Sequence, residues 1–578
     1  MCNKGSSIED YLKKILSKAI RDAAAEKDRL LPDAVSFEIE RPKHEGQGDR
    51  ATSAALQLSK IFGTSPRELA ARIVAKLESE REKEKEKEKE TGGGGLIEKI
   101  EIAGPGFINF FLSKKWLHSV LADVLKCGDA YGSSDIGGGR RVQVEFVSAN
   151  PTGPLHIGHG RGAAVGDVLA NLLTFTGWKV EREYYINDAG LQMEILGNST
   201  QARYFELLGR PDAAPFPGDG YKGDYIYDLA RSVISAEGER FLSMPPSESL
   251  PWFRRFAGDV ILDDIKAILA NFGVSFDVWF SESSLYARNL VPQAMDHLKK
   301  RGYAFEADGA LWFKSSDFED EKDRVLIRAN GVPTYFASDI AYHRDKFDRG
   351  FDRVIDIWGA DHHGYVPRMK AGIEAIGRAP DDLDVLLIQF VNLVRNGVQV
   401  PMSTRSGQFI TLRDVVNEVG VDATRYFFLM RRSDSQLDFD LELARRQSND
   451  NPVYYVQYAH ARICSIMRER QERGKSPASG LNPDVSEDAL DGEETRKVVS
   501  CLALFPQEIE NASVELAPHA ITTYAYNLAG CFHSFYNTNR ILGEAPEVEA
   551  ARLMVAEGVR IVLSRCLALL GVSAPEKM

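Results

Sequence analysis

The sequence predicts a multidomain α/β protein built around a doubly wound parallel sheet, and three observations support that fold class. The chain has 578 residues, more than the roughly 250–300 that one hydrophobic core usually holds. Between residues 141 and 440, apolar strand-like runs alternate with helical patterns, which is typical of a parallel sheet covered by helices. Beyond residue 441, Val456, Ala459 and Ile463 keep a three–four spacing, which predicts an all-α region.

The composition is that of a globular chain in water. Hydrophobic residues make up 44% and charged residues 27% of the sequence, and both values are ordinary. No run approaches the roughly 18 apolar residues of a membrane span, and the N-terminus lacks the apolar core of a signal peptide. We therefore expect a cytoplasmic protein without a membrane partner.

Charge and cysteine content narrow the possible ligands. The formal net charge of −13 argues against indiscriminate binding of nucleic acid, although it leaves room for a local basic face that fits one shaped RNA. The six cysteines form no Cys-x-x-Cys pair, so we expect no bound zinc.

The N-terminal region, residues 1–113, is expected to form a small α/β domain. Residues 8–25 have a helical pattern, and residues 97–112 have strand character. Residues 79–95 are a low-complexity insert, in which Lys and Glu alternate before four glycines. Its charges nearly cancel and no aromatic residues are interleaved, so a solvated tether is a better interpretation than an RNA-binding arm.

The doubly wound region, residues 114–440, divides into two halves. Its second half restarts with the apolar run 354–359 and continues through 385–391. The periodicity is mixed at about 199–323, as expected of an insertion between the halves of a sheet. Residues 441–578 complete the chain as a helical domain.

One loop has the features of a phosphate-binding site. An apolar strand pattern ends near Ser148, a break follows at Asn150 and Pro151, and His156, Gly158 and His159 then open a helical pattern. Main-chain N–H groups and the positive end of the helix dipole favour an anion at such a place. For an isolated pair of histidines a structural role would be the better interpretation, so the case rests on the flanking sequence.

That flanking sequence resembles a known family. Residues 146–162, Phe-Val-Ser-Ala-Asn-Pro-Thr-Gly-Pro-Leu-His-Ile-Gly-His-Gly-Arg-Gly, resemble the HIGH signature of class I aminoacyl-tRNA synthetases in its arginyl-tRNA synthetase form. Residues 402–407 take the place of the second signature, Lys-Met-Ser-Lys-Ser. Pro401 and Thr404 stand where that signature has lysine, and Arg405 keeps a cation in the loop.

The resemblance extends to both outer domains. Two strings, at residues 48–52 and 102–112, look like the N-terminal domain of these synthetases, with Arg50 where the family usually has an aromatic residue. An arginine there could still stack on a base or pair with phosphate. Residues 451–462 look like the anticodon-binding bundle, whose aromatic residues, among them Tyr458, could stack on splayed bases.

The resemblance covers the chain apart from the low-complexity insert, and it implies an architecture and a reaction. The expected architecture is an N-terminal α/β domain that binds the tRNA elbow, a Rossmann-like catalytic domain and a C-terminal all-α anticodon-binding bundle. The expected enzyme is an arginine–tRNA ligase, which forms arginyl-adenylate from L-arginine and ATP with Mg²⁺ and transfers the arginine to tRNA(Arg). Members of the family usually activate the amino acid only with tRNA bound. We expect a monomer.

The resemblance also implies three sets of site residues. The catalytic residues would be His156, His159 and Arg405. The ATP site would comprise Pro151, His156, Gly158, His159, Gly359, Asp361, His363, Met402, Ser403, Thr404 and Arg405. The arginine site would comprise Glu145, Ser148, Asn150, Tyr335, Asp339 and His362.

The residues themselves favour two members of the arginine site, Glu145 first and Asp339 next. Glu145 is a charge inside an otherwise apolar strand, and such a charge needs a partner. Asp339 lies four residues after Tyr335, on the same face of a helix. Two alternatives remain open at this point: a different adenylate-forming nucleotidyltransferase, and a non-catalytic RNA-binding paralogue that lost the loop lysines.

Overall fold

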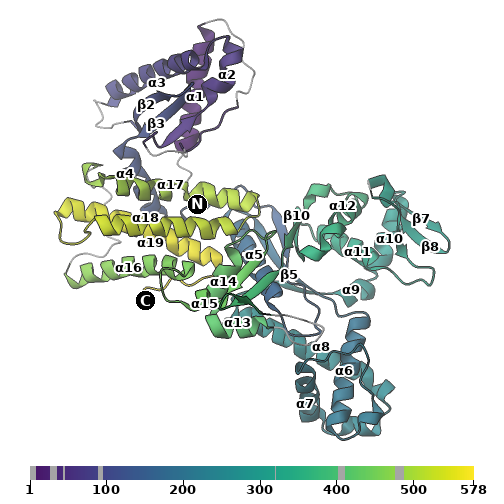
Figure 1. The fold of residues 1–578 in the computed structure, drawn as a ribbon. Helices are drawn as coiled ribbons and strands as arrows, with labels where there is room; N and C mark the ends of the chain where they lie inside the picture. The colour runs from purple at the N-terminus through teal and green to yellow at the C-terminus, as the bar shows by residue number, and fades with distance from the viewer. Residues whose placement is uncertain are drawn as a thin grey trace.

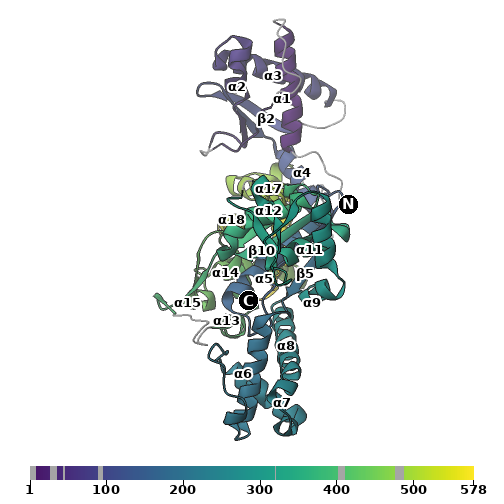
Figure 2. The same cartoon turned by 90° about the vertical axis from the view of Figure 1, so that its right-hand side faces the viewer.

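The doubly wound domain lies in the middle of an elongated molecule. The computed structural model describes residues 8–26, 36–42, 46–88, 95–318, 320–400, 410–474 and 487–578. The N-terminal domain stands at one end, and a helical projection built by α6, α7 and α8 stands at the other, as two views a quarter-turn apart show (Figures 1 and 2). The C-terminal helices lie between the N-terminal domain and the catalytic sheet (Figure 1).

The central sheet confirms the predicted fold class. Its five strands are ordered β11-β10-β4-β5-β6, and every neighbouring pair is parallel. They are β4 (Arg141–Glu145), β5 (Lys179–Ile186), β6 (Val278–Ser281), β10 (Arg353–Gly359) and β11 (Leu383–Ile388). The strand order reverses at β4, which lies between β10 and β5, and a reversal of this kind predicts a crevice at the carboxyl ends of the strands. Ligands of doubly wound sheets bind in such crevices.

The helices around this sheet position the site. The main ones are α5 (Ile157–Phe175), α11 (Tyr335–Asp348) and α12 (Val366–Ala375). The chain from residue 391 to residue 445 adds α13 (Leu412–Val419), α14 (Val421–Leu429) and α15 (Leu441–Arg445), with a small sheet of β12 (Val391–Arg395), β13 (Val398–Gln399) and β14 (Leu437–Asp440).

The stretch expected to be an insertion is more divided than its pattern indicates. The helices α6 (Leu191–Leu207), α7 (Tyr225–Glu237) and α8 (Pro246–Asn271) have a core of their own. Strand β6 then returns to the central sheet, and a second unit follows: α9 (Glu282–Ala287), α10 (Leu290–Lys300), β7 (Ala304–Ala307), β8 (Ala310–Phe313) and β9 (Arg324–Ile327). Four residues of β6 are too few to show a period in the sequence.

The N-terminal domain has a three-stranded antiparallel sheet in the order β1-β3-β2. Its elements are α1 (Ile8–Ala25), β1 (Arg50–Thr52), α2 (Ala54–Phe62), α3 (Pro66–Glu88), β2 (Ile97–Ala103) and β3 (Phe107–Leu112). Our expectation of a tether was wrong for residues 79–88, because α3 continues through them to Glu88. Glu and Lys are strong helix formers, and Arg81 pairs with Glu78 one turn earlier.

Arg50 does not fill the role that we considered for it. Its side chain is buried, and its Nε donates to Glu9 Oε1 at 2.6 Å. The guanidinium also donates to the Asp49 carbonyl. A buried, paired arginine of this kind holds α1 on the sheet and presents no face on which a base could stack.

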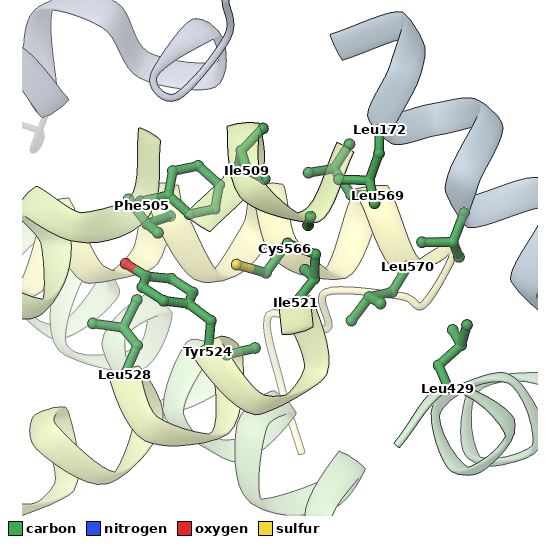
Figure 3. Close-up of a cluster of buried hydrophobic side chains, with 14 of the residues drawn as sticks. Leu172, Leu429, Phe505, Ile509, Ile521, Tyr524, Leu528, Cys566, Leu569 and Leu570 are labelled. Atoms are coloured by element: carbon green, nitrogen blue, oxygen red, sulfur yellow. The ribbon is translucent and has the colours of Figure 1, made fainter. Parts of the chain in front are cut away.

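The C-terminal helices form the predicted all-α bundle. They are α16 (Pro452–Glu472), α17 (Glu493–Val514), α18 (His519–Thr538) and α19 (Pro546–Leu570), and α4 (Lys114–Cys127) packs on α17 and α19. The bundle shares its core with the catalytic domain: Leu172 of α5 and Leu429 of α14 point toward Leu569 and Leu570 at the end of α19 (Figure 3). Across the described residues, no helix combines the length and apolar character that crossing a membrane requires.

Candidate active site

The two histidines of the predicted loop form a cap on α5. His156 is the N-cap residue, and its Nδ1 accepts hydrogen bonds from the main-chain N–H of Gly158 at 3.1 Å and of His159 at 3.4 Å. The Nδ1 of His159 accepts in turn from the N–H of His156 at 3.3 Å. The two rings stack with centroids 3.6 Å apart. This reciprocal capping satisfies N–H groups that a helix start leaves without partners.

The cap determines where each imidazole holds its hydrogen. Because Nδ1 is an acceptor in both rings, the neutral tautomer places the hydrogen on Nε2. Burial lowers the pKa of His156, and burial together with His156 holds the pKa of His159 well below its usual value. Both rings are therefore neutral Nε2–H donors at physiological pH. A Cβ on Gly158 would lie 3.0 Å from the His156 ring, so only glycine leaves this cap undisturbed.

A strained turn joins β4 to this loop. Val147 and Ser148 have φ values of 68° and 39°, the left-handed region that residues other than glycine seldom adopt. The turn aims Ser148 Oγ back at Glu145, to which it donates at 2.9 Å, while it accepts from the N–H of Tyr185 at 3.1 Å. Pro151 is buried where the loop begins.

Glu145 already has a charged partner within the protein. Its Oε2 accepts from Lys346 Nζ at 2.6 Å, and that lysine also donates to Asp356 Oδ1 at 2.8 Å. The Lys346 side chain is fully buried. Burial raises the pKa of Glu145, and Lys346 opposes that shift. The partner that a charge in an apolar strand needs is thus Lys346 of α11, whose contact the sequence did not show.

A cavity of about 550 Å³ opens beside this network and brings together three of the six residues predicted to bind arginine, Tyr335, Asp339 and His362. Glu145, Ser148 and Asn150 lie beside the cavity rather than in its lining, and Asn150 Nδ2 donates to Gln192 Oε1 at 2.6 Å. Tyr335 is 71% exposed and stands at the opening.

Two buried carboxyl groups in this cavity repel each other. Burial raises the pKa of Asp339 to about 6, against the hydrogen bond from Tyr365 Oη at 2.5 Å. Burial, Asp339 and Asp188 together raise the pKa of Glu282 to about 7. Ionisation of both carboxyl groups is unfavourable in the empty cavity, and a bound cation would stabilise the two negative charges. A planar guanidinium, with several N–H donors, suits a pair of carboxylates better than a point charge does.

Sequence reasoning missed Glu282, Tyr185 and Tyr365. Glu282 begins α9 in Ser-Glu-Ser-Ser and looks like an acid in the first turn of a surface helix. The available signal was its position directly after the apolar run of β6, since the carboxyl end of a parallel strand is where site residues collect.

The end of β10 places the second predicted nucleotide segment on the surface. Gly359 ends the strand, and a Cβ there would lie 2.5 Å from Asp361 Oδ1. Asp361 lies 3.6 Å from His362 Nε2, whereas His363 Nδ1 contacts the Ala360 carbonyl. The ion pair of Asp361 is therefore with its neighbour His362, and His363 contacts the main chain instead.

The second signature, including Met402, Ser403, Thr404 and Arg405, lies outside the described residues. The chain that follows it is tied to the histidine loop. Leu412 N–H donates to the Leu155 carbonyl at 2.8 Å, and Thr411 forms an isolated bridge with His156.

Arg161, two residues after His159 in α5, has a structural role. It is fully buried, and its guanidinium donates to the carbonyls of Gln389, Arg432 and Ser435 at 2.7–2.9 Å. It holds the start of α5 against the chain around β12. Because its guanidinium is buried and bound to these carbonyls, Arg161 does not contact a phosphate at the histidine loop.

The helical bundle presents one arginine between two tyrosines. The guanidinium of Arg462 lies 4.6 Å from the ring centroids of both Tyr458 and Tyr536, and Tyr458 Oη accepts from it at 2.6 Å. Tyr455 instead packs on Tyr526 and His533.

Three family models match consecutive parts of the chain. The arginyl tRNA synthetase N terminal domain matches residues 10–112, the catalytic domain of class I tRNA synthetases (R) matches 121–429, and the DALR anticodon binding domain matches 456–578. The central match assigns the fold and the histidine loop to the class I aminoacyl-tRNA synthetases.

Comparison with individual proteins identifies the family within that class. The chain is 51% identical to the arginine–tRNA ligase of Geobacter sp. (strain M21), over 99% of this chain and 100% of the relative. It is 46% identical to the arginine–tRNA ligase of Bacillus subtilis (strain 168), over 100% of both. The structure of the Thermus thermophilus arginyl-tRNA synthetase matches its fold with a TM-score of 0.72 at 22% identity, covering 98% of this chain and 100% of that one. The chain belongs to the arginine–tRNA ligase family.

Proposed function

We propose that this chain activates L-arginine with ATP and transfers the arginine to tRNA(Arg), with the histidine loop as the nucleotide site and the acidic cavity as the amino-acid site. One observation supports this division above the others. Neutral Nε2–H donors at the start of α5 and a pair of buried carboxyl groups meet the same carboxyl edge of the sheet. An anionic nucleotide and a cationic amino acid are the ligands that such a pair of sites suits.

In the first step, the carboxylate of arginine attacks the α-phosphorus of ATP, the arginyl-adenylate forms and pyrophosphate leaves. Negative charge grows on the phosphoryl oxygens as this happens. The Nε2–H groups of His156 and His159 would donate to that charge, and the cap on α5 holds both rings in place beforehand, so little reorganisation is needed. In the second step, a terminal ribose hydroxyl of tRNA attacks the carbonyl carbon and AMP leaves.

The amino acid would be held from both ends. Its guanidinium would lie between Asp339 and Glu282, with Tyr335 and His362 at the opening. Because Glu145 pairs with Lys346, its charge would act on the amino acid from beside the cavity. Ser148 and Asn150 would form hydrogen bonds with the polar groups on the α-carbon of arginine. Gly359, Asp361 and His363 would receive the adenosine at the end of β10.

Magnesium would enter with ATP as part of that substrate and hold its phosphates. Among the described residues, no group of three or more His, Cys, Asp or Glu side chains could hold a metal ion by itself. The pyrophosphate would depart past Arg405. We further propose that the enzyme is a cytoplasmic monomer and that the Tyr458–Arg462–Tyr536 group contacts the anticodon, because stacked aromatic and guanidinium planes suit unpaired bases.

Arginine-dependent ATP–pyrophosphate exchange, measured with and without tRNA(Arg), tests the proposal. We expect exchange with arginine and tRNA present, a large loss when lysine replaces arginine, and formation of arginyl-tRNA from the same mixture. Exchange that another amino acid supports equally well would contradict the assignment of the cavity. Tight binding of tRNA without exchange or charging would instead favour the non-catalytic paralogue.

A further inference from the structure

Two cysteines line a second cavity, which lies between the N-terminal domain and the helical bundle and has a volume of about 980 Å³. Arg41, Asp49 and Arg50 of the N-terminal domain line one side, and α17 and α18, which lie next to that domain in Figure 1, line the other. Cys501 of α17 and Cys531 of α18 belong to this lining. None of the described residues of the catalytic domain does, so the proposed function gives this cavity no role.

Arg41 is the cation of this cavity that acts on both thiols. The other arginines and the lysine of the lining are paired, in the ion pairs Arg50–Glu9, Arg496–Asp49 and Lys497–Glu493. The Arg41 guanidinium instead donates to the Ser500 carbonyl at 3.0 Å, directly before Cys501, and interacts with Cys501 and Cys531. Burial raises the pKa of Glu508, the third acid of the lining, and Arg41 opposes that shift. A guanidinium next to a thiol favours the thiolate form.

The two thiols differ in access and in acidity. Cys501 is only 8% exposed, whereas Cys531 is half-buried. The hydrogen bond from the Cys501 thiol lowers the pKa of Cys531 to about 7, against the effect of burial. Arg41 and Lys497 lower it further, and Glu494 opposes them. The same hydrogen bond and burial raise the pKa of Cys501. Near neutral pH, Cys531 is therefore partly a thiolate, while Cys501 remains a thiol.

Two other cysteines lack this combination. Cys464 of α16 is also half-buried, but its Sγ lies 3.8 Å from His460 Nδ1 and burial raises its pKa. Cys566 of α19 lies in the apolar core (Figure 3), where burial raises its pKa as well. A nucleophilic thiol has to be both accessible and partly ionised, and of these four cysteines Cys531 meets both conditions.

We propose that Cys531 and Cys501 form a redox-active dithiol that small-molecule disulfides oxidise. The Cys531 thiolate attacks one sulfur of the disulfide RSSR, the S–S bond breaks, and RS⁻ leaves with the electron pair. The Cys501 thiol then loses its proton and attacks the Cys531 sulfur, so that a Cys501–Cys531 disulfide forms and the second RS⁻ leaves. The pair gives up two electrons and two protons, and RSSR takes them up as two thiols. This inference does not rest on the proposed function.

The arrangement suits both steps. The first attack falls to Cys531, because Cys501 is nearly inaccessible. Since α17 packs along α18 and the two thiols share a hydrogen bond, Cys501 lies next to the sulfur that it has to attack in the second step. In a reducing compartment cellular thiols would reverse the reaction, so the pair would respond to transient oxidation.

The first test measures the reactivity of the thiols in the reduced, full-length protein. Iodoacetamide should alkylate Cys531 roughly tenfold faster than Cys464 at pH 7, because the larger thiolate fraction outweighs the weaker nucleophilicity of a more acidic thiol. The rate at Cys531 should reach half of its maximum near pH 7. Cys501→Ala should raise that midpoint, whereas Cys501→Ser should keep it, because a hydroxyl still donates to the thiolate.

The second test follows oxidation by 2-hydroxyethyl disulfide, with peptide mass spectrometry after acid quenching. Wild type should form the Cys501–Cys531 disulfide and release two thiols per protein. Cys501→Ser should accumulate the mixed disulfide at Cys531 instead, and Cys531→Ser should form neither product. Cys464→Ser serves as the matched control and should behave as wild type does.

Two results would overturn the proposal, and both are read from the wild-type protein, so they do not depend on how well a variant folds. One is alkylation of Cys531 no faster than that of Cys464. The other is a mixed disulfide at Cys531 that persists without resolution by Cys501. A Cys501→Ala midpoint equal to that of wild type would also contradict it, because the buried thiol would then have no influence on its partner.

Discussion

The histidine loop and the acidic cavity are assembled in opposite ways. In the loop, His156 and His159 are oriented by main-chain N–H groups within the same helical turn. In the cavity, Glu282 and Asp339 come from α9 and α11, and Tyr365 follows β10. The main-chain N–H groups of the loop are capped in the free protein, whereas the cavity confines two carboxyl groups that repel each other. Variants of the loop should therefore change the rate of activation, while variants of the cavity should change affinity and stability in opposite directions.

The largest effect is expected from His156→Asn. Asparagine is a good N-cap residue and can accept the main-chain hydrogen bonds that Nδ1 accepts, so the melting temperature should change little. It cannot place a donor where Nε2–H lies, and loss of one such donor costs roughly 100- to 1000-fold in rate. The measurement is tRNA-dependent ATP–pyrophosphate exchange beside a thermal melt. His156→Ala should lose the same rate and about 1 kcal/mol of stability in addition.

An exchange rate near wild type in His156→Asn would show that the imidazole only caps the helix. His159→Ala provides the second test, since its ring stacks on that of His156 and receives the reciprocal hydrogen bond. Binding of tRNA should persist in all three variants, because none of these side chains lies in the bundle or the N-terminal domain.

The second-largest loss of rate is expected at the cation that neutralises the departing pyrophosphate. Pro401 and Thr404 replace the loop lysines. A lysine just before the first signature could supply the missing charge, but those positions are Gly153, Pro154 and Leu155. Since Arg161 is committed to three carbonyls, Arg405 is the remaining candidate. Arg405→Ala should lower the adenylation rate roughly 10- to 100-fold with an unchanged KM for arginine.

Two companion variants sharpen that result. Thr404→Lys should be tolerated or mildly activating. Arg161→Ala should lower the melting temperature, because it leaves three carbonyls without their donor. If Arg405→Ala keeps the wild-type rate while Arg161→Ala is stable but inactive, the phosphate role belongs to Arg161 and our interpretation of its contacts is wrong.

In the cavity, Glu282→Gln and Asp339→Asn should each raise the KM for arginine roughly 10- to 100-fold while the KM for ATP stays constant. The same variants should make the ligand-free protein more stable at pH 8, because one of two repelling charges is removed. Both folded-state pKa values are raised, so the destabilisation grows as the pH rises toward and through about 6 and 7. Glu374→Gln, an exposed acid on α12, serves as the control.

Equal changes in both KM values, or a loss of stability in the charge-removing variants, would break the contrast between loop and cavity. The first outcome would place these carboxyl groups outside the amino-acid site. The second would show that they are paired in the free protein, as Glu145 is with Lys346.

The pH dependence of arginine binding should show two steps. Glu282, with a pKa of about 7, protonates first as the pH falls, and Asp339 follows at about 6. Only the ionised forms attract a guanidinium, so affinity should fall up to tenfold per pH unit between 7 and 6 and more steeply below 6. Calorimetric titration of arginine from pH 5.5 to 8 measures this profile. Glu282→Gln should remove the upper step. A profile that stays flat down to pH 6 would exclude Glu282 from the site, and one that stays flat down to pH 5.5 would exclude Asp339 as well.

The sequence predicted those parts of the molecule that depend on neighbouring residues. The histidine loop could be predicted because its strand, turn and helix start lie within one short segment, and the parallel sheet could be predicted from its apolar runs. Contacts between residues that are distant in the sequence could not be predicted. Lys346 looks like an ordinary lysine on a helix, yet it holds Glu145 and Asp356. Arg161 looks like a free cation near a phosphate site, and only the fold shows the carbonyls that surround it.

The smallest effect is expected from the low-complexity insert, which belongs to neither site. The helical part of α3 is anchored as far as Arg81, which donates to Glu98 O at 2.7 Å, so a useful deletion begins after that residue. Removal of residues 84–94 and closure with a short Gly/Ser linker changes loop entropy by only about 1 kcal/mol. Lys and Glu nearly balance there, so few phosphate contacts are lost. We expect tRNA(Arg) affinity and charging within about twofold of wild type in filter binding and aminoacylation. A drop of tenfold or more in tRNA affinity, with an unchanged melting temperature, would show that the insert contacts RNA.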